Sequence, residues 1–343
     1  MRLASFAVTT PTGTATRLGL DVGTDQLLDV NAAYAELVAG QCDPGRARHI
    51  ADAVLPPDML GFLANGDVAS EALDALRAGE FEVDHNRFGQ RMQYRVDEIA
   101  LLAPLPRPRS IRDCSAFEEH VRNASGPRGV PGQWYRHPTY YKGNPSSVVG
   151  TGAAVRRPAA ETRMDYELEF AVVIGTAGKD IPVEAAHRHV AGYMVFNDVS
   201  CRDIQLAEMR AFLGPAKGKD FDTGNVLGPY LVTPDEFDPT APNAMVARVD
   251  GEEWSRGRTD SLYYSVSEII SYISRDESLH PGDVIGAGTV GGGCGLELGR
   301  YPAMGQEVEL DISGLGVLRN RFVDARHSTR KESEWADSMA KSH

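Results

Sequence analysis

The sequence lacks the features that would place it in several broad classes of protein. It has four cysteines, Cys42, Cys114, Cys201 and Cys294, and no two of them form a C-x-x-C motif. This spacing excludes the common zinc and redox motifs and is typical of reduced thiols. No stretch approaches the roughly 20 apolar residues that a membrane-spanning helix needs. The start of the chain also lacks the apolar segment of a signal peptide, so we expect a cytoplasmic protein with no membrane partner.

Positive charge is scarce as well. The 343 residues include 35 Lys and Arg against 48 Asp and Glu, which gives a net charge of −13. A general nucleic-acid surface needs basic patches, so we expect no nucleic-acid partner. With 42% hydrophobic and 24% charged residues, the composition is that of an ordinary globular protein with one large or two smaller domains.

The character of the chain changes at a Pro-rich segment, PLPRPRS, at 104–110. We place a domain boundary there, between a small N-terminal domain at 1–104 and a larger domain at 105–325. A polar tail follows at 326–343.

Hydrophobic periodicity predicts helices at 31–40, 68–80 and 265–275, with a further helix at 183–190. The segment at 90–104 is typical of extended structure. The larger domain consists mainly of strand-like runs separated by Gly, Pro and Asp. These patterns predict a mixed α+β fold with much strand, and they do not fit an alternating βαβ fold.

An unusual strand begins in the segment MDYELEFAVVIG at 164–175. Asp165, Glu167 and Glu169 occupy alternate positions, and side chains two apart in a strand share a face. Two ionised carboxylates this close repel each other, unless water, basic partners or a cation relieves the repulsion. An edge strand with a solvated acidic face is the simplest interpretation of this stretch alone.

Two further carboxylates stand in similar contexts elsewhere. Asp198 follows an apolar strand in VFNDVSCRDIQ, and Asp113 follows the Pro-rich segment in IRDCSAFEEH. A set of ligands made only of oxygen suits a hard cation such as Mg²⁺ or Ca²⁺.

Five segments, in this order, resemble the fumarylacetoacetate hydrolase family. Each motif alone is weak, but together they are specific, and the resemblance runs from about residue 107 to about residue 325. The segments are YYKGNPSSVVG (140–150), MDYELEFAVVIG (164–175), VAGYMVFNDVSCRDIQ (190–205), GKDFDTGNVLGPYLVTPDE (218–236) and HPGDVIGAGT (280–289). The first 100 residues resemble, more loosely, the variable small domain of many members.

The resemblance implies a fumarylacetoacetase-like β-sandwich roll preceded by a small α/β domain. It also implies a homodimer and a divalent cation, Mg²⁺ with Mn²⁺ or Ca²⁺ as alternatives. By position, the metal ligands are Asp113, Glu167, Glu169 and Asp198. Lys219 and Arg202 fit the role of cationic neighbours to this acidic set, although a surface lysine and a structural ion pair are the simpler interpretations of the two.

The resemblance also identifies a catalytic pair. A short-chain branch of the family uses an H-x-x-E motif, but here His120 is followed at the fourth position by Asn123. The spacing of seven residues from Asp113 to His120 is similar to that of fumarylacetoacetase, whose glutamate corresponds to Glu297. Lys219 joins this pair as a catalytic donor. The residues placed to meet the substrate are Tyr141, Lys142, Arg202, Gln205 and Thr289.

From this resemblance we expect a metal-dependent hydrolase that cleaves a carbon–carbon bond in a 1,3-dicarbonyl or 2,4-dioxo acid. His120, oriented by Glu297, would activate water. Specificity would lie in a lid at 114–138, where Arg122, Arg128 and Arg136 are candidates to meet an acidic substrate. The alternatives are a decarboxylase, isomerase or hydratase of 2-oxo acids on the same site, and a binding protein without catalysis.

Overall fold

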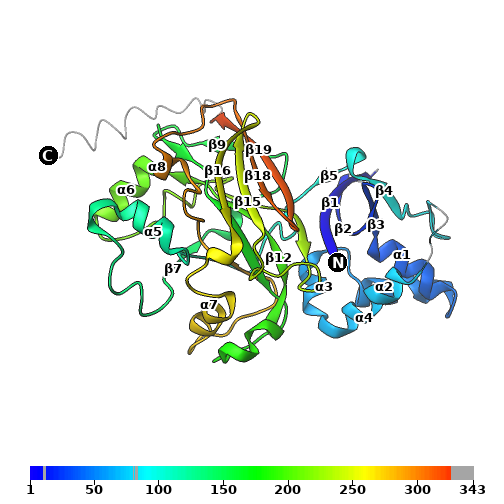
Figure 1. The fold of residues 1–343 in the computed structure, drawn as a ribbon. Helices are drawn as coiled ribbons and strands as arrows, with labels where there is room; N and C mark the ends of the chain where they lie inside the picture. Colours follow the sequence, from blue (N-terminus) through cyan, green and yellow to red (C-terminus); the bar gives the residue numbers. More distant parts are fainter. Residues whose placement is uncertain (11–12, 80, 82–83, 326–343) are drawn as a thin grey trace.

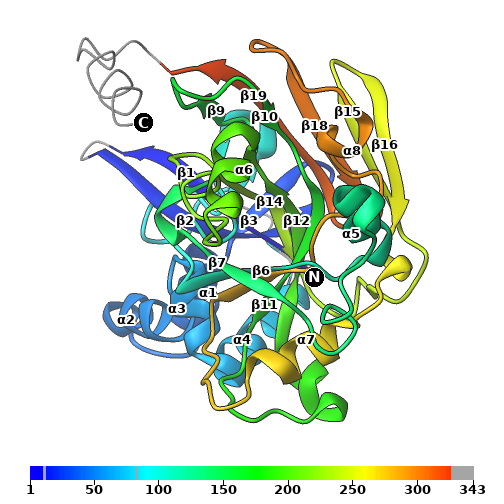
Figure 2. The same cartoon turned by 90° about the vertical axis from the view of Figure 1, so that its left-hand side faces the viewer.

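The structure is a computed structural model that describes residues 1–10, 13–79, 81 and 84–325. The polar tail predicted at 326–343 lies outside these ranges. Two β-sheets form the body of the molecule. Figure 1 shows the N-terminal helices α1–α4 together at one end, and α5, α6 and α8 together at the opposite end. Figure 2 looks onto that second end.

The larger sheet has twelve strands. Ten follow the order β4-β3-β2-β1-β14-β12-β11-β17-β6-β7, while β5 pairs with β1 and β8 pairs with β14. The bounds are β1 Arg2–Thr10, β2 Gly13–Gly23, β3 Gln26–Asp29, β4 Gln93–Arg95, β5 Ala100–Leu101, β6 Ser110–Cys114, β7 Tyr140–Gly143, β8 Val148–Val149, β11 Leu168–Ile174, β12 Val190–Asp198, β14 Asn225–Val232 and β17 Asp283–Gly286.

Two smaller sheets complete the strands of the described residues. The five-stranded sheet has the order β16-β15-β18-β19-β9, and β10 pairs with β13 alone. The bounds are β9 Ala154–Arg157, β10 Met164–Asp165, β13 Ser200–Cys201, β15 Ala244–Val249, β16 Glu252–Arg258, β18 Glu307–Ile312 and β19 Gly316–Asp324.

The helices lie mainly outside these sheets. The α-helices are α1 Val30–Ala39, α2 Pro44–Val54, α3 Met59–Ala64, α4 Gly66–Arg77, α5 Glu118–Ser125, α6 Arg202–Arg210, α7 Val266–Ile273 and α8 Gly295–Leu298. Short 3₁₀ turns are η1 Val96–Glu98, η2 Gly126–Arg128, η3 Pro145–Ser147, η4 Val183–His189 and η5 Thr259–Ser261. Within the described part of the chain, none of these helices is long and apolar enough to cross a bilayer.

The helices with strong hydrophobic periodicity are confirmed. The predictions at 31–40, 68–80 and 265–275 correspond to α1, α4 and α7. α7 begins with a capping box, in which Ser265 and Glu268 satisfy each other's backbone N–H groups. The helix predicted at 183–190 is a 3₁₀ helix instead, and the extended segment at 90–104 contains two short strands around η1.

The apolar run in β11 is buried on both faces. One face, which includes Phe170 and Val172, packs in the core between the two large sheets. The other face, with Ala171 and Val173, packs in a second core together with residues of the N-terminal helices. A strand that is covered on both faces needs apolar residues at both its odd and its even positions, which explains the composition of β11.

The N-terminal segment shares this architecture with the rest of the chain. β1 pairs antiparallel with β14, so the larger sheet continues from one predicted domain into the other. The second core contains Leu18 and Leu73 from before residue 104 together with Phe196 and Val284 from after it. Backbone pairing and side-chain packing thus both cross the boundary that the sequence predicts at the Pro-rich segment. The division into two domains remains a prediction.

Candidate active site

Four carboxylates meet at one edge of the larger sheet. β12, β11, β17 and β6 are neighbours in that sheet, and β11 runs antiparallel to β12 and to β17, while β6 is parallel to β17. The start of β11 therefore lies beside the ends of β12 and β6. This edge collects Asp113, Glu167, Glu169 and Asp198, whose oxygens lie within 4.8 Å of one another.

These carboxylates are enclosed in the protein. Glu169 is 0% exposed and Glu167 is 5% exposed, so a solvated acidic edge strand is the wrong interpretation of this segment. Asp113 and Asp198 each present a buried Oδ1 that has no hydrogen-bond partner among the described residues. Unpartnered buried oxygens are costly unless a ligand satisfies them.

The space between the strands comes from a glycine in β17. A Cβ atom at Gly286 would lie 2.2 Å from Oδ1 of Asp113, so any side chain at this position would fill the gap. The four oxygen donors and the gap beside them fit a hard divalent cation.

Burial and mutual repulsion raise the pKa of some carboxyl groups in this cluster. Burial, together with the charge of Asp198, raises the pKa of Asp113 well above its ordinary value. Burial and the charge of Asp113 do the same to the pKa of Glu169. Burial opposes ionisation of Glu167 too, but Lys219 and Arg202 hold its pKa below the ordinary value. The cluster thus carries more negative charge than its cationic neighbours balance.

Both predicted cationic neighbours are buried beside the carboxylates. Lys219 Nζ lies 2.7 Å from Glu167 Oε2 and also donates to Asp198. Arg202 Nη2 lies 2.8 Å from Glu167 Oε1, and its Nε donates to Asp165 Oδ2 at 2.8 Å. Lys219 is thus no surface lysine, and the Arg202 guanidinium is engaged in holding carboxylates.

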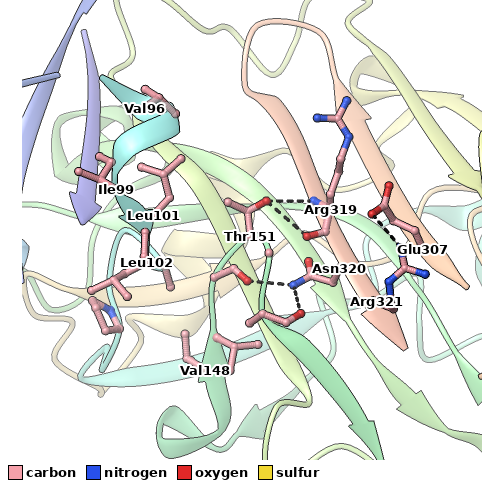
Figure 3. A pocket seen from close by; sticks show the side chains of 17 residues that line it. Val96, Ile99, Leu101, Leu102, Val148, Thr151, Glu307, Arg319, Asn320 and Arg321 are labelled. Carbon is pink, nitrogen blue, oxygen red and sulfur yellow. Dashed lines mark hydrogen bonds and ion pairs between the residues drawn. The ribbon is translucent and has the colours of Figure 1, made fainter. Parts of the chain in front are cut away.

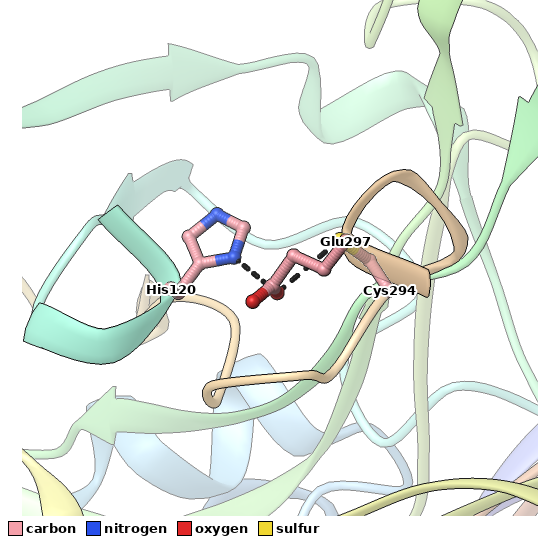
Figure 4. Close-up of side chains that lie close together, drawn as sticks. All are labelled: His120, Cys294 and Glu297. Atoms are coloured by element: carbon pink, nitrogen blue, oxygen red, sulfur yellow. Dashed lines mark hydrogen bonds and ion pairs between the residues drawn. The ribbon is translucent and has the colours of Figure 1, made fainter. Parts of the chain in front are cut away.

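A histidine and a glutamate form a second group close by. His120 Nδ1 on α5 lies 2.7 Å from Glu297 Oε1 on α8. Figure 4 shows the two side chains pointing toward one another. Asn123, one helical turn after His120, donates to the other oxygen of Glu297 at 2.7 Å. Burial opposes ionisation, but the hydrogen bond with His120 holds the pKa of Glu297 below its ordinary value. The carboxylate therefore stays ionised and orients the imidazole.

Two residues around this pair make contacts that sequence reasoning did not predict. Cys294 Sγ lies 3.5 Å from Glu297 Oε1 (Figure 4). Asp165 accepts hydrogen bonds from the backbone N–H groups of Gly295 at 2.7 Å and Leu296 at 2.9 Å, at the start of α8. Asp165 therefore links the helix that carries Glu297 to Arg202. For Asn123, the signal available in the sequence was its spacing of three from His120, which places both on one helix face.

A cavity of about 350 Å³ opens onto both groups. It is lined by Asp113 and Glu167 from the acidic cluster and by His120. Three of the residues predicted to meet the substrate, Tyr141, Gln205 and Thr289, also line it. The Tyr141 hydroxyl donates to Asp198 at 2.7 Å, and Thr289 Oγ1 donates to Glu169 at 3.0 Å.

Gln205 retains free donor capacity in this cavity. Its Oε1 accepts from Arg202 at 2.8 Å. No hydrogen bond to another described residue engages its Nε2, which leaves the NH₂ group available to a ligand.

Two predicted substrate contacts lie elsewhere. Strand alternation places Tyr141 beside Asp113 and Lys142 beside Arg112, on the opposite face of β6 and β7. The Lys142 ammonium is exposed, lies 3.3 Å from Glu277 and does not line the cavity. Arg202 is also absent from the lining, because its guanidinium is enclosed behind Glu167.

A larger cavity of about 840 Å³ lies apart from these groups (Figure 3). Residues 96 and 99–103 line one side of it, and Arg319, Asn320 and Arg321 of β19 line the other. None of the candidate catalytic residues borders this cavity. Size alone therefore does not identify the reactive site, whereas the convergence of carboxylates with a histidine pair does.

Comparisons with known proteins identify relatives of this chain. A family model described as fumarylacetoacetate (FAA) hydrolase C-terminal matches residues 109–323. The chain is 28% identical over 309 residues to oxaloacetate tautomerase YisK of Bacillus subtilis, covering 89% of this chain and 95% of that protein. It is 32% identical over 278 residues to a mitochondrial oxaloacetate tautomerase of Homo sapiens, covering 79% of this chain and 82% of the other. Among solved structures, a fumarylacetoacetate hydrolase from Exiguobacterium antarcticum matches with a TM-score of 0.68 and 27% identity, over 94% of this chain and all of that one.

Proposed function

Because this chain belongs to the fumarylacetoacetate hydrolase family, we propose that it is an enzyme that interconverts the keto and enol forms of a 2-oxo acid. Two relatives that align with most of this chain are named oxaloacetate tautomerases. This support favours the isomerase that the sequence left as an alternative over carbon–carbon hydrolysis. The observation that carries the proposal is the contact of 2.7 Å between His120 Nδ1 and Glu297 Oε1 beside the acidic cluster.

Keto–enol conversion moves one proton between a carbon and an oxygen. A base must remove the proton next to the keto group, and positive charge must stabilise the oxygen that becomes negative. His120 Nε2 is the atom free to take the proton, because Nδ1 is held by Glu297. The Glu297 carboxylate stabilises the imidazolium that results, as in other histidine–carboxylate pairs. Return of a proton from Nε2 to the substrate oxygen completes the enol.

A divalent cation fits the four carboxylates, and we infer Mg²⁺ from the oxygen-only donor set, with Mn²⁺ or Ca²⁺ as alternatives. When bound, such an ion supplies Lewis-acid stabilisation of the negative oxygen of a 2-oxo acid. Asp113, Glu167, Glu169 and Asp198 would hold it.

Other residues of the cavity would orient the substrate. The free NH₂ group of Gln205 is placed to donate to a substrate oxygen. Lys219 balances Glu167 and Asp198 and keeps the floor of the cavity from repelling an anionic substrate. Tyr141 and Thr289 fix Asp198 and Glu169, so their part is to hold carboxylates in position.

Hydrolysis of a carbon–carbon bond is the second candidate, and one feature favours it. The His120 side chain is 15% exposed, so water reaches the same imidazole that would act on a carbon-bound proton. A tautomerase keeps the carbon skeleton of its substrate intact, whereas a hydrolase yields two smaller products.

The experiment supplies Mg²⁺ and either oxaloacetate or a 2,4-dioxo acid in deuterated buffer. We expect faster loss of the enol absorbance, deuterium at the carbon next to the keto group, and no cleavage products by NMR. His120→Asn should lower kcat by roughly 10²- to 10⁴-fold, because it removes the base. His187→Asn, in η4 outside the cavity, is the matched control and should leave kcat unchanged.

Two smaller acids appearing in step with substrate loss would replace the tautomerase with the hydrolase. If His120→Asn kept full activity in both keto–enol conversion and carbon–carbon hydrolysis, His120 would not be the base in either mechanism. The cytoplasmic location expected from the sequence stays a prediction, since the name of one relative places that relative in mitochondria.

A further inference from the structure

We propose that the preferred substrate is a 2-oxo acid whose far end is uncharged and apolar. In such a substrate a hydrocarbon group replaces the second carboxylate of oxaloacetate. This inference rests on the proposed function and narrows it to a substrate class. It follows from the part of the cavity lining that the end of α6 and the loop after it supply.

This side of the cavity consists of apolar and neutral groups. Met209 on α6, Pro215 after it and Tyr140 on β7 line it, together with Gly214. Among the described residues, Lys219 is the one lysine of the lining, and no arginine lines it. Lys219 is already engaged by Glu167 and Asp198. A second substrate carboxylate would therefore lose its hydration at this wall without gaining a cationic partner.

The apolar surface continues from the cavity onto the adjoining loop. Met209, Phe212 and Leu213 are 54%, 97% and 79% exposed, an unusual density of exposed large apolar side chains. Phe212 has a φ of 60°, a conformation that bulky residues rarely adopt. Strain of this kind persists where the surrounding structure imposes it, and it is frequent at ligand sites.

The loop is fixed to α6 by one carboxylate. Glu208 accepts hydrogen bonds from the backbone N–H groups of Ala216 at 3.1 Å, Lys217 at 2.6 Å and Gly218 at 3.1 Å. These contacts hold the far end of the loop, and Phe212 and Leu213 lie in the chain between Met209 and Gly214, which both line the cavity. An alkyl chain that leaves the cavity on this side would meet these residues.

The lid arginines do not supply the missing charge. Arg122 is paired with Glu118 one helical turn away, and Tyr135 donates to the same carboxylate. Neither Arg122 nor Arg128 nor Arg136 lines the cavity. Within the part of the chain that the structure describes, these arginines therefore offer no cation to an acidic far end of the substrate.

The first test measures enzyme-dependent proton exchange at the carbon next to the keto group. The substrates are oxaloacetate and a series of 2,4-dioxo acids with unbranched acyl chains of increasing length. We expect kcat/KM to rise with each added methylene, by up to about fourfold per group that becomes buried. A flat or falling series would overturn the apolar site, whatever the rate with the first member.

The second test reverses the chemistry of the wall. Met209→Arg places a cation where the proposal puts hydrocarbon. It should raise kcat/KM for oxaloacetate relative to the longest 2,4-dioxo acid by at least roughly tenfold, the size of a modest charge-assisted contact. Comparing this ratio between variant and native enzyme cancels the different intrinsic reactivities of the two substrates. Val68→Arg, at an exposed position on α4, is the matched control and should leave the ratio unchanged.

The outcomes separate this inference from the function on which it rests. If no 2-oxo acid exchanges its proton faster with enzyme than without, the proposed function fails. If oxaloacetate exchanges well, the series is flat and Met209→Arg leaves the ratio unchanged, the tautomerase stands and the apolar site is wrong.

Discussion

Two buried aspartates perform the same structural task at different helices. Asp29 accepts from the N–H of Ala32 at the start of α1 and pairs with Arg17 through contacts of 2.6 and 2.8 Å. Asp165 accepts from the N–H groups at the start of α8 and pairs with Arg202. The difference lies in what each helix carries, because α8 holds Glu297 whereas α1 holds no candidate site residue.

This pair offers a controlled test of Asp165 as a positioning residue. Asp165→Asn replaces an acceptor oxygen with a donor and should disturb both α8 and Arg202. We expect kcat to fall by roughly 10- to 100-fold with little change in KM, because such supporting contacts orient the catalytic group. Asp29→Asn should cost comparable stability, about 3–5 kcal/mol for breaking a buried pair, with kcat per folded chain unchanged. Equal kcat values for the two variants would show that Asp165 serves stability alone.

Among the elements, strand β6 carries functional or stabilising charged side chains on both of its faces. One face presents Asp113 to the acidic cluster. The other carries Arg112, whose guanidinium contacts Glu277, lies 2.5 Å from Ser110 Oγ and 3.9 Å from Asp283. Ion pairs and a hydrogen bond of Arg112 therefore stabilise the strand that supplies a candidate metal ligand, on the face opposite Asp113. The side-chain hydrogen bond from Arg112 is the largest cause of a Glu277 pKa below its ordinary value, with burial opposing it.

The sign of this shift predicts how the pair responds to pH. A lowered pKa means that the contribution is present above the unfolded-state pKa, near 4.3, and is lost as pH falls through the folded-state value. Glu277→Gln should thus be less stable by about 1 kcal/mol at pH 7, a modest figure because the carboxylate is partly exposed. The difference from native protein should shrink below about pH 4. Urea titrations from pH 7 to pH 3 measure it.

Glu252→Gln is the comparison for that experiment. Glu252 pairs with Arg300 at the surface and is largely exposed, so its loss should change stability little at any pH. If the loss of unfolding free energy in Glu277→Gln stayed constant down to pH 3, the ion pair would not be the source of that loss.

For the whole molecule, the acidic cluster lowers the stability of the metal-free fold, but the same carboxylates are the candidate ligands of a cation. Four buried carboxylates near one another destabilise the metal-free fold, and a bound cation would relieve that repulsion. Ligand that binds only the folded state raises stability by about 2.7 kcal/mol at a concentration of one hundred times its Kd.

Glu169→Gln should therefore move two observables in opposite directions. The metal-free variant should unfold at a higher temperature than the metal-free native protein, because glutamine removes the cost of burying an ionisable carboxyl group beside three others. Its response to added Mg²⁺ should nearly vanish, because a ligand is gone. Thermal unfolding with EDTA and with a Mg²⁺ series measures both effects, and an unchanged Mg²⁺ response would remove Glu169 from the ligand set.

Assembly is a second property of the whole molecule. The family resemblance implies a two-fold dimer, the commonest closed arrangement for identical chains. Light scattering at working concentration should give twice the chain mass of 37.2 kDa. A mass that stays at the value for one chain across a concentration series would contradict the dimer.

Features that depend on near neighbours along the chain could be predicted from the amino-acid sequence. The alternation of Glu167 and Glu169 predicted a shared face, and the structure places both on one edge of the sheet. The periodicity of the segments at α1, α4 and α7 predicted helices, because burial of one face repeats every three or four residues. The order of several short motifs indicated the family, which the matching family model confirms.

Which of these residues contact one another depends on the packing of distant segments. Asp165 and Gly295 are 130 positions apart, and His120 and Glu297 are 177 apart, so no local pattern connects them. The register of β6 with β7 turned Tyr141 toward the cavity and Lys142 away from it, a choice that a shift of one residue would reverse. Long-range contacts depend on how whole strands pair, and strand pairing is settled by burial across the entire core.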